Sequence, residues 1–133
     1  VVRKVLGRGT WNMLHRMAAQ YPRDPTPAQR DDMATYFRVL GEFYPCDVCA
    51  THFRTMLAAN PVEAGNNKEL SLWLCRIHNI VNTRLHKPEQ FPCTLDALGG
   101  KYGECGCFED FAAANATSPD PSVASAAPAP AAA

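Results

Sequence analysis

Six cysteines carry most of the chemistry in this sequence of 133 residues. They are Cys46, Cys49, Cys75, Cys93, Cys105 and Cys107. Six cysteines can pair in many ways, so their number fixes no connectivity. Four of them form two close pairs, a CxxC and a CxC, and a disulfide between near neighbours removes little entropy from the unfolded chain. The close pairs therefore indicate thiol exchange or metal binding rather than stabilisation.

The CxxC pair lies at the expected start of a helix. Pro45 precedes Cys46, and Cys49 and Phe53 share one face of a helix predicted over about 46–59. Unpaired N–H groups and the positive end of the helix dipole stabilise a thiolate at that position. At least one of the two thiols should therefore have a lowered pKa, as a redox dithiol requires. An inert buried pair or a static disulfide is the alternative.

A zinc site competes with the redox interpretation. Cys46, Cys49, Cys75 and His78 follow the spacing C-x2-C-x25-C-x2-H, which supplies sulfur and nitrogen ligands for a closed tetrahedral site. A fold held by such a metal would leave Cys93 and the CxC pair without a role. Redox exchange is the favoured hypothesis, and a zinc-stabilised helical binding module without catalysis is the second.

Polar and aromatic groups lie on two of the expected helices. Cys75, His78 and Asn82 fall at i, i+3 and i+7 of an apolar helix, where they need a polar ligand or a satisfied buried network. Trp11 and His15, one turn apart, add an aromatic plane and a second imidazole that could face the same cavity. Ordinary bundle core is the alternative for all of them. No G-x-G-x-x-G loop is present, so a dinucleotide would not be held in the Rossmann manner.

Prolines separate the helical segments. A first helix is expected over about 7–20, a second from Pro27 behind a Thr26/Gln29 capping pair, and a long fourth behind Asn66. Short connections between four helices predict an all-α four-helix bundle, with a further short helical turn after Cys93. No useful strand pattern supports a thioredoxin-like reductase or isomerase, which is a weaker third hypothesis.

Charge and composition bound the remaining possibilities. The chain has 13 basic and 13 acidic side chains and no long basic run, which argues against nucleic-acid binding. No apolar run is long enough for a membrane span. Residues 108–133 are expected to form a disordered tail, since they are rich in alanine and proline, and residues 1–107 to form one domain. Asn115 begins a glycosylation sequon in that tail.

Taken together, these motifs resemble the ERV/ALR family of sulfhydryl oxidases. The segments that carry the resemblance are LGRGTW at 6–11 followed by His15, YPCDVCATHF at 44–53, and WLCRIHNIVN at 73–82 followed by Leu85 and Lys87. They span nearly the whole expected domain in order. The resemblance implies a helical bundle that binds FAD, oxidises thiols to disulfides and passes the electrons to oxygen, giving hydrogen peroxide.

The resemblance also implies roles for single residues. Cys46 and Cys49 would be the catalytic pair, with Cys49 beside the flavin and Cys46 facing incoming thiols. Cys105 and Cys107 would be a catalytic C-terminal shuttle that serves the partner subunit of a homodimer. Cys75 and Cys93 would form a structural disulfide, and no metal is expected. The implied FAD-binding residues are Gly7, Arg8, Trp11, His15, Tyr44, His52, Cys75, His78, Asn79, Val81, Asn82, Leu85 and Lys87.

Partners and location are implied only in outline. The substrate would be reduced protein thiols or an oxidoreductase carrier. Disulfide use, the CxC pair and the sequon favour the lumen of the endoplasmic reticulum, with the mitochondrial intermembrane space as the alternative.

Overall fold

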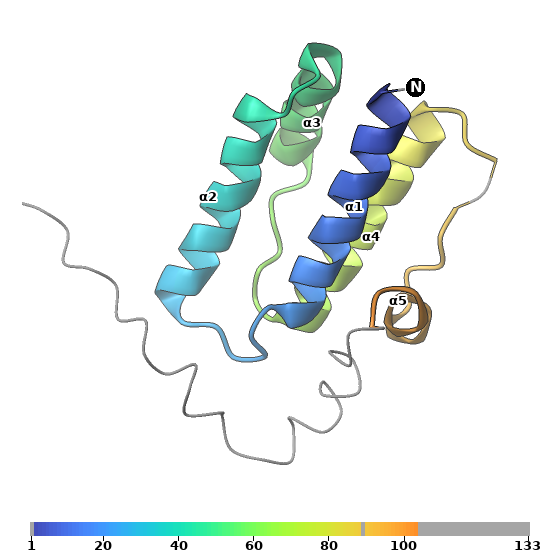
Figure 1. The fold of residues 1–133 in the computed structure, drawn as a ribbon. Coiled ribbons are helices and arrows are strands. Elements are labelled where there is room, and N and C mark those ends of the chain that lie inside the picture. The colour runs from blue at the N-terminus through green and yellow to red at the C-terminus, as the bar shows by residue number, and fades with distance from the viewer. Residues whose placement is uncertain (1, 89, 104–133) are drawn as a thin grey trace, which may run out of the picture.

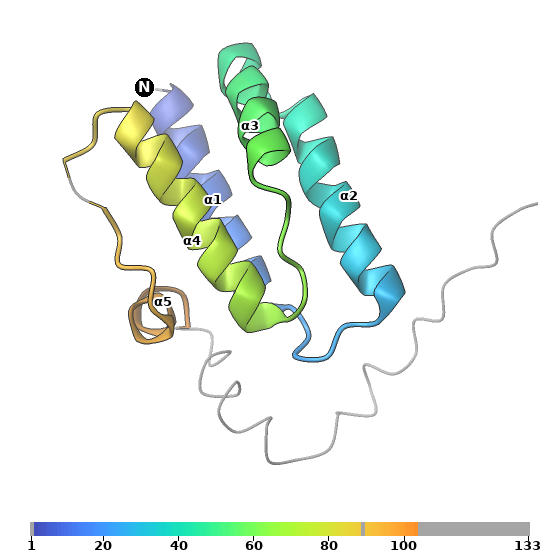
Figure 2. The ribbon, with the colours of Figure 1, turned by 180° about the vertical axis from the view of Figure 1, so that it is seen from behind.

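Helices account for all the regular structure in residues 2–88 and 90–103, which are the residues that the computed structural model describes. They are α1 (Val2–Gln20), α2 (Pro27–Phe43), α3 (Asp47–Ala59), α4 (Asn67–Arg84) and α5 (Leu95–Tyr102). Figure 1 shows α1 beside α4 and α2 beside α3, and the reverse view in Figure 2 shows the same pairs with α5 next to α4. The prediction of an all-α fold with four long helices and a short additional one is confirmed.

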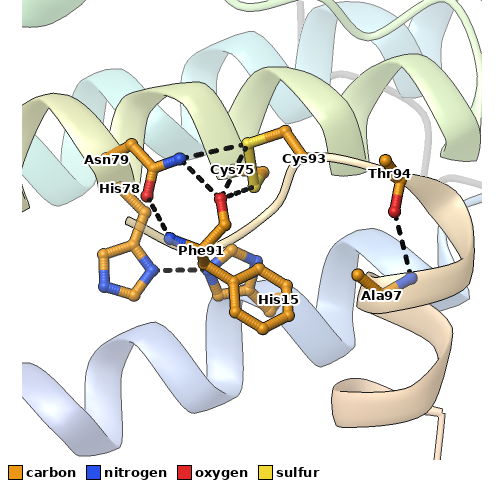
Figure 3. Close-up of a disulfide and its surroundings, with 8 residues drawn as sticks. All are labelled: His15, Cys75, His78, Asn79, Phe91, Cys93, Thr94 and Ala97. Carbon is orange, nitrogen blue, oxygen red and sulfur yellow. Dashed lines mark hydrogen bonds between the residues drawn. A yellow bond between two sulfur atoms is a disulfide. The ribbon is translucent and has the colours of Figure 1, made fainter. Parts of the chain in front are cut away.

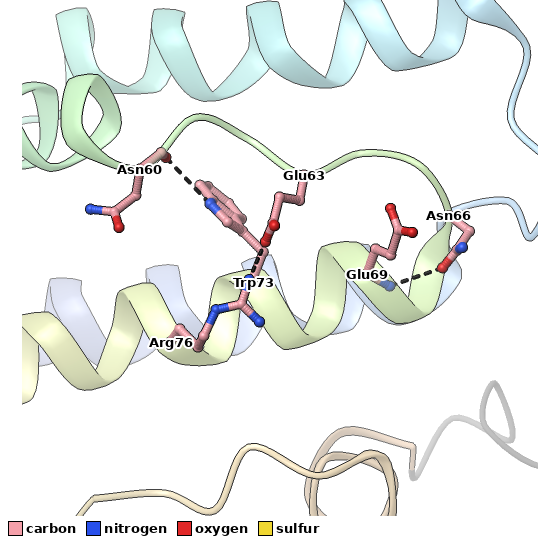
Figure 4. A network of polar contacts seen from close by, with 6 residues as sticks. All are labelled: Asn60, Glu63, Asn66, Glu69, Trp73 and Arg76. Atoms are coloured by element: carbon pink, nitrogen blue, oxygen red, sulfur yellow. Dashed lines mark hydrogen bonds and ion pairs between the residues drawn. The ribbon is translucent and has the colours of Figure 1, made fainter.

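Side-chain caps define the starts of two helices as the sequence predicts. The Thr26 hydroxyl accepts from Gln29 N at 3.1 Å, and the Gln29 side chain accepts from Thr26 N at 2.9 Å, so both halves of a capping box are present. Asn66 Oδ1 accepts from Glu69 N at 2.9 Å and caps α4 (Figure 4). These bonds satisfy backbone donors that the first turn leaves without partners.

Two helices are longer than the sequence predicts. α1 begins at Val2 instead of near Gly7, because Gly7 and Gly9 each cost only about 1 kcal/mol inside a helix and Arg3, Lys4 and Leu6 are good helix formers. α5 has two turns, where one was expected. Its N-cap Thr94 accepts from Ala97 N at 3.2 Å, and its packing buries Leu98 and Tyr102. Tertiary packing therefore outweighs the glycines in α5, whereas the first turn of α1 is exposed and depends on helix propensity.

The apolar core lies toward one end of the bundle. Leu14, Phe37 and Trp73 are at most 2% exposed, and the rings of Phe37 and Trp73 meet edge to face at 5.0 Å. Trp73 Nε1 donates to Asn60 O at 3.3 Å, which ties the end of α3 to α4 (Figure 4). An exposed ion pair between Glu63 and Arg76 lies on the same loop-to-helix contact.

The opposite end of the bundle is less closed. It holds the start of α1, the end of α4 and the start of α3 (Figure 1). Val5, Val48 and Leu85 at this end are 66%, 52% and 57% exposed. The apolar side chains there are thus left without a full covering.

No helix in the described ranges is both long and apolar enough to cross a membrane. The expected tail, the domain limit at residue 107, and the Cys105/Cys107 pair lie outside the described residues.

Candidate functional site

A disulfide between Cys46 and Cys49 occupies the start of α3. Cys46 is the N-cap residue in extended conformation, and its carbonyl accepts from Ala50 N at 2.8 Å. Its amide donates to Tyr44 O at 2.8 Å, which fixes the entry to the helix. No side chain caps the first turn, so its free N–H groups and the positive helix end act on the sulfurs. The structure confirms the predicted placement at a helix start, and that placement would stabilise a thiolate on reduction.

A hollow of about 430 Å³ opens beside Cys46. Its lining consists of Arg3, Pro45, Cys46, Asp47 and Val48. Cys49 is not among the lining residues, so Cys46 is the cysteine of the pair that borders this hollow. Sequence reasoning missed Arg3, because the first helix was expected to begin after it.

Four rings from three helices form two stacked pairs joined by a contact between two histidines, together called the ring stack. Trp11 lies flat against His78, with ring centres 4.0 Å apart and planes 5° from parallel. His15 Nε2 and His78 Nδ1 are 2.8 Å apart, and the Tyr102 ring stacks on His15 at 4.3 Å. Figure 3 shows the two imidazoles reaching toward each other from α1 and α4. The structure thus joins three predicted site residues and adds Tyr102, which the short turn expected after Cys93 did not reach.

Both histidines of this stack are neutral at pH 7. Burial lowers the pKa of His15 to about 3, and the charges of His78 and Lys101 add to the effect. Burial also lowers the pKa of His78 to about 4, with contributions from Lys87 and Lys101. In the 2.8 Å contact one ring nitrogen therefore donates and the other accepts. Each ring keeps only one N–H, so the pair presents a flat, uncharged surface.

A second disulfide fastens the segment after α4. Cys75, which is 1% exposed, is bonded to Cys93 (Figure 3). Asn79 Nδ2 donates to Phe91 O at 2.8 Å, and Phe91 N donates to Asn79 Oδ1 at 3.1 Å. These bonds hold residues 91–93 against α4 and so set the position of α5.

The zinc hypothesis needs Cys75 as a free thiolate. Its bond to Cys93 removes it from that role in this structure. Across residues 2–88 and 90–103, no three His, Cys, Asp or Glu side chains are arranged to hold a metal ion.

The other predicted cofactor residues lie on α1, α3 and α4 and in the segments just before α3 and just after α4. Arg8, His52, Leu85 and Lys87 are exposed, whereas Gly7, Tyr44, Asn79 and Val81 are half-buried. Asn82 is buried, and within the described structure its Oδ1 atom has no hydrogen-bond partner. A buried polar atom without a partner costs free energy and suits a ligand that donates to it.

The cysteine pair and the ring stack form two separate parts of the site. Arg3 of the hollow and Trp11 of the stack lie on one helix, roughly 12 Å apart along its axis at 1.5 Å per residue. Exposed apolar side chains, Ile80 and Leu85 of α4 among them, belong to the same end of the bundle. One ligand that touched both parts would have to be elongated and would need flat ring systems.

The family match and the individual relatives of this chain agree with one another. Residues 8–103 match the Erv1/Alr family. The chain is 47% identical over 106 residues to the FAD-linked sulfhydryl oxidase ERV1 of Arabidopsis thaliana, covering 79% of this chain and 54% of the relative. It is 39% identical over 90 residues to the mitochondrial FAD-linked sulfhydryl oxidase ERV1 of Saccharomyces cerevisiae, covering 68% and 47%. The chain thus spans about half the length of the curated relatives that it matches.

A solved structure has the same fold. The crystal structure of a cysteine-to-serine double mutant of Erv1 from Saccharomyces cerevisiae superimposes with a TM-score of 0.71 at 33% identity, covering 76% of this chain and 83% of that one.

The histidine pair predicts an acid-sensitive fold. Both folded-state pKa values lie below the ordinary 6.5, so between about pH 6.5 and pH 3 the unfolded chain binds more protons than the folded chain. The free energy of unfolding should therefore fall as the pH is lowered from about 7 to 4, by roughly 1–2 kcal/mol per pH unit at the steepest. Urea unfolding across this range measures the slope.

The variant His15→Gln should give a shallower slope, because one of the two shifted imidazoles is gone. His86→Asn is the matched control, since His86 is exposed and asparagine tolerates its positive φ of 54°. Equal slopes for the parent and His15→Gln would contradict the assignment of neutral, buried histidines.

Proposed function

This chain belongs to the Erv1/Alr family, and on that premise we propose that it is an FAD-dependent thiol oxidase that makes disulfides in other proteins. The observation that carries the proposal is the Cys46–Cys49 disulfide at an uncapped helix start, with Cys46 open to a hollow. A static structural bridge needs no access from solvent. A bridge that exchanges with incoming thiols does.

The residues present fit FAD. The stack of Trp11 and His78 supplies a flat aromatic surface for an adenine ring, and the neutral imidazole pair avoids charge in that pocket. The unpartnered Asn82 Oδ1 would accept from the cofactor, and exposed Arg8 and Lys87 would face its phosphates. When bound, FAD takes two electrons from a dithiol and can return them to oxygen.

The other predicted FAD contacts also divide between the cysteine pair and the ring stack. The cysteine end would receive the flavin ring, near Tyr44, His52 and Leu85, while the ring stack would receive the adenine. The roughly 12 Å between the two parts along α1 calls for an elongated ligand of this kind.

Two substrate thiolates and the Cys46–Cys49 disulfide are the only reactants that thiol exchange at Cys46 needs. A substrate thiolate attacks Cys46 Sγ, forms a mixed disulfide and breaks the Cys46–Cys49 bond, and the electron pair leaves on Cys49. A second substrate thiolate then attacks the substrate sulfur, and Cys46 leaves as a thiolate. The substrate gains a disulfide, and Cys46 and Cys49 hold the two electrons. The free N–H groups at the start of α3 stabilise the thiolates in both steps.

The C-terminal CxC pair would deliver electrons to the partner subunit of a homodimer. Tyr102 is held at the level of Arg16, because its carbonyl accepts from Arg16 Nη1 at 3.3 Å. Arg3, beside Cys46, lies roughly 20 Å further along α1. Cys105 follows Tyr102 closely in sequence, and the chain between them spans at most about 11 Å. This separation favours exchange with Cys46 of a second copy over exchange within one chain.

We extend the proposal to acceptor, substrate and location. Oxygen would be the final acceptor, giving hydrogen peroxide, and the substrates would be reduced proteins or an oxidoreductase carrier. An oxidising compartment suits such a catalyst. The sequon at Asn115 and the CxC pair favour the endoplasmic reticulum lumen, and the name of the yeast mitochondrial relative supports the intermembrane space as the alternative.

Cys49→Ser tests the redox pair. Without Cys49 no disulfide can re-form at Cys46, so oxygen uptake with dithiothreitol should fall more than about 100-fold. The double variant Cys105→Ser/Cys107→Ser should keep most dithiothreitol oxidation and lose most oxidation of a reduced, unfolded protein. An oxygen electrode measures both substrates. If the double variant oxidised the protein substrate as fast as the parent, the shuttle role would be wrong.

Mixing two chains that are each deficient toward protein substrates tests transfer between subunits. One chain carries Cys46→Ser/Cys49→Ser and the other Cys105→Ser/Cys107→Ser, and each alone should oxidise a protein substrate poorly. After subunit exchange, half of the randomly paired dimers contain one copy of each variant. Each of these has one of the two CxC-to-CxxC transfer paths of the parent dimer, so about a quarter of the parent rate should be recovered. Transfer within one chain would give no recovery on mixing.

A further inference from the structure

The first turn of α1 presents a basic pair between two exposed apolar side chains beside the redox disulfide. Val2, Arg3, Lys4 and Val5 follow one another there, and Val2 and Val5 are 79% and 66% exposed. Arg3 lines the hollow at Cys46, and α1 carries no acidic residue along its length. Asp47 is the acidic side chain in the lining and offsets one of these charges. This surface, residues 2–5 together with the hollow, is called the α1 entrance below.

The chain itself contains a segment of matching pattern. Phe108, Glu109, Asp110 and Phe111 directly follow the CxC pair and place two acidic residues between two aromatic ones. The basic pair flanked by valines and the acidic pair flanked by phenylalanines are thus complementary in charge and in apolar content. Segments with this arrangement attract each other through charge and bury apolar area on contact.

Exposed apolar side chains around the hollow add apolar surface that could contact Phe108 and Phe111. Val48, in the lining, is 52% exposed, and Phe43, two residues before Pro45, is 80% exposed. Phe43 ends α2 and Val48 is in the first turn of α3, and Figure 1 shows these two helix ends at the same end of the bundle as the start of α1. A phenylalanine of an incoming segment would therefore find apolar surface next to the sulfur that exchanges.

We propose that the α1 entrance is the docking site for residues 108–111 of a second copy of this chain. Glu109 and Asp110 pair with Arg3 and Lys4, and the two phenylalanines cover the exposed apolar groups. Docking holds the preceding Cys105/Cys107 pair at Cys46 and raises the rate of exchange. This inference rests on the proposed function, because it names the contact that guides the shuttle.

Trapping the exchange partners tests this proposal without a protein substrate. In the full-length, FAD-loaded chain with Cys49→Ser and Cys107→Ser, oxidised glutathione can link Cys46 of one copy to Cys105 of another, releasing two molecules of reduced glutathione. The readout is the initial rate of this covalent dimer, identified by non-reducing electrophoresis and peptide mass spectrometry. In this background Glu109→Lys/Asp110→Lys should slow dimer formation about threefold to tenfold, and so should Arg3→Glu/Lys4→Glu.

Combining the two reversals should restore the rate to within about twofold of the starting background, because opposite charges face each other again. Asp31→Lys/Asp32→Lys is the matched control for Glu109→Lys/Asp110→Lys. It makes the same change in net charge, but on an exposed part of α2 at the other end of the bundle. Phe108→Ala/Phe111→Ala should also slow the reaction.

Two outcomes would overturn the proposal. In one, reversal at 109 and 110 has no more effect than the control. In the other, reversal at Arg3 and Lys4 slows reaction with an added acidic cysteine peptide but not with the second copy, which would make the α1 entrance a site for external substrates. Dithiothreitol oxidation by the parent separates these results from failure of the proposed function, because a small dithiol reaches Cys46 without docking.

Discussion

The contact between α1 and α4 sets the arrangement on which the whole site depends. His15 and His78 meet at 2.8 Å, and Trp11 lies flat on His78, so the register of the two helices is fixed by buried polar and aromatic groups together. That register brings the start of α1 and the end of α4 to the end of the bundle where α3 begins (Figure 1). The same contact holds α5, since Tyr102 stacks on His15. The ring stack and α5 are therefore positioned by one packing arrangement, while the disulfide is carried by α3, which packs on α2.

Charge is distributed unevenly along this arrangement. The imidazoles at its centre are kept neutral by burial, which suits a flat aromatic ligand. The Cys46 and Cys49 sulfurs lie at the start of α3, where backbone N–H groups point toward them. The basic first turn of α1 is next to the same hollow. A site that forms thiolates needs positive potential at the sulfur and gains nothing from charge at the ring stack. The two environments are separated by about two turns of α1, roughly 12 Å.

The sequence predicts which segments are helical better than it predicts where each helix begins and ends. The caps at Thr26 and Asn66 are visible because capping depends on neighbours within a few residues. The start of α1 and the second turn of α5 are missed, because glycines suggest a break in both places. Helix-forming neighbours override it in α1, and the burial of Leu98 and Tyr102 overrides it in α5. Tyr102 and Arg3 are missed for the same reason, since each lies in the part of a helix that local pattern leaves out. No local signal could show that Tyr102 stacks on His15, which is far away in sequence.

The central claim is that the bundle holds a flavin next to an exchangeable disulfide. A visible absorption spectrum of the purified chain, recorded before and after anaerobic addition of dithiothreitol, tests it most directly. The account predicts a yellow protein with about one bound flavin per chain, whose colour bleaches on reduction and returns with oxygen uptake when air is admitted. A colourless protein that carries stoichiometric zinc and stays inert to dithiothreitol after incubation with FAD would contradict it.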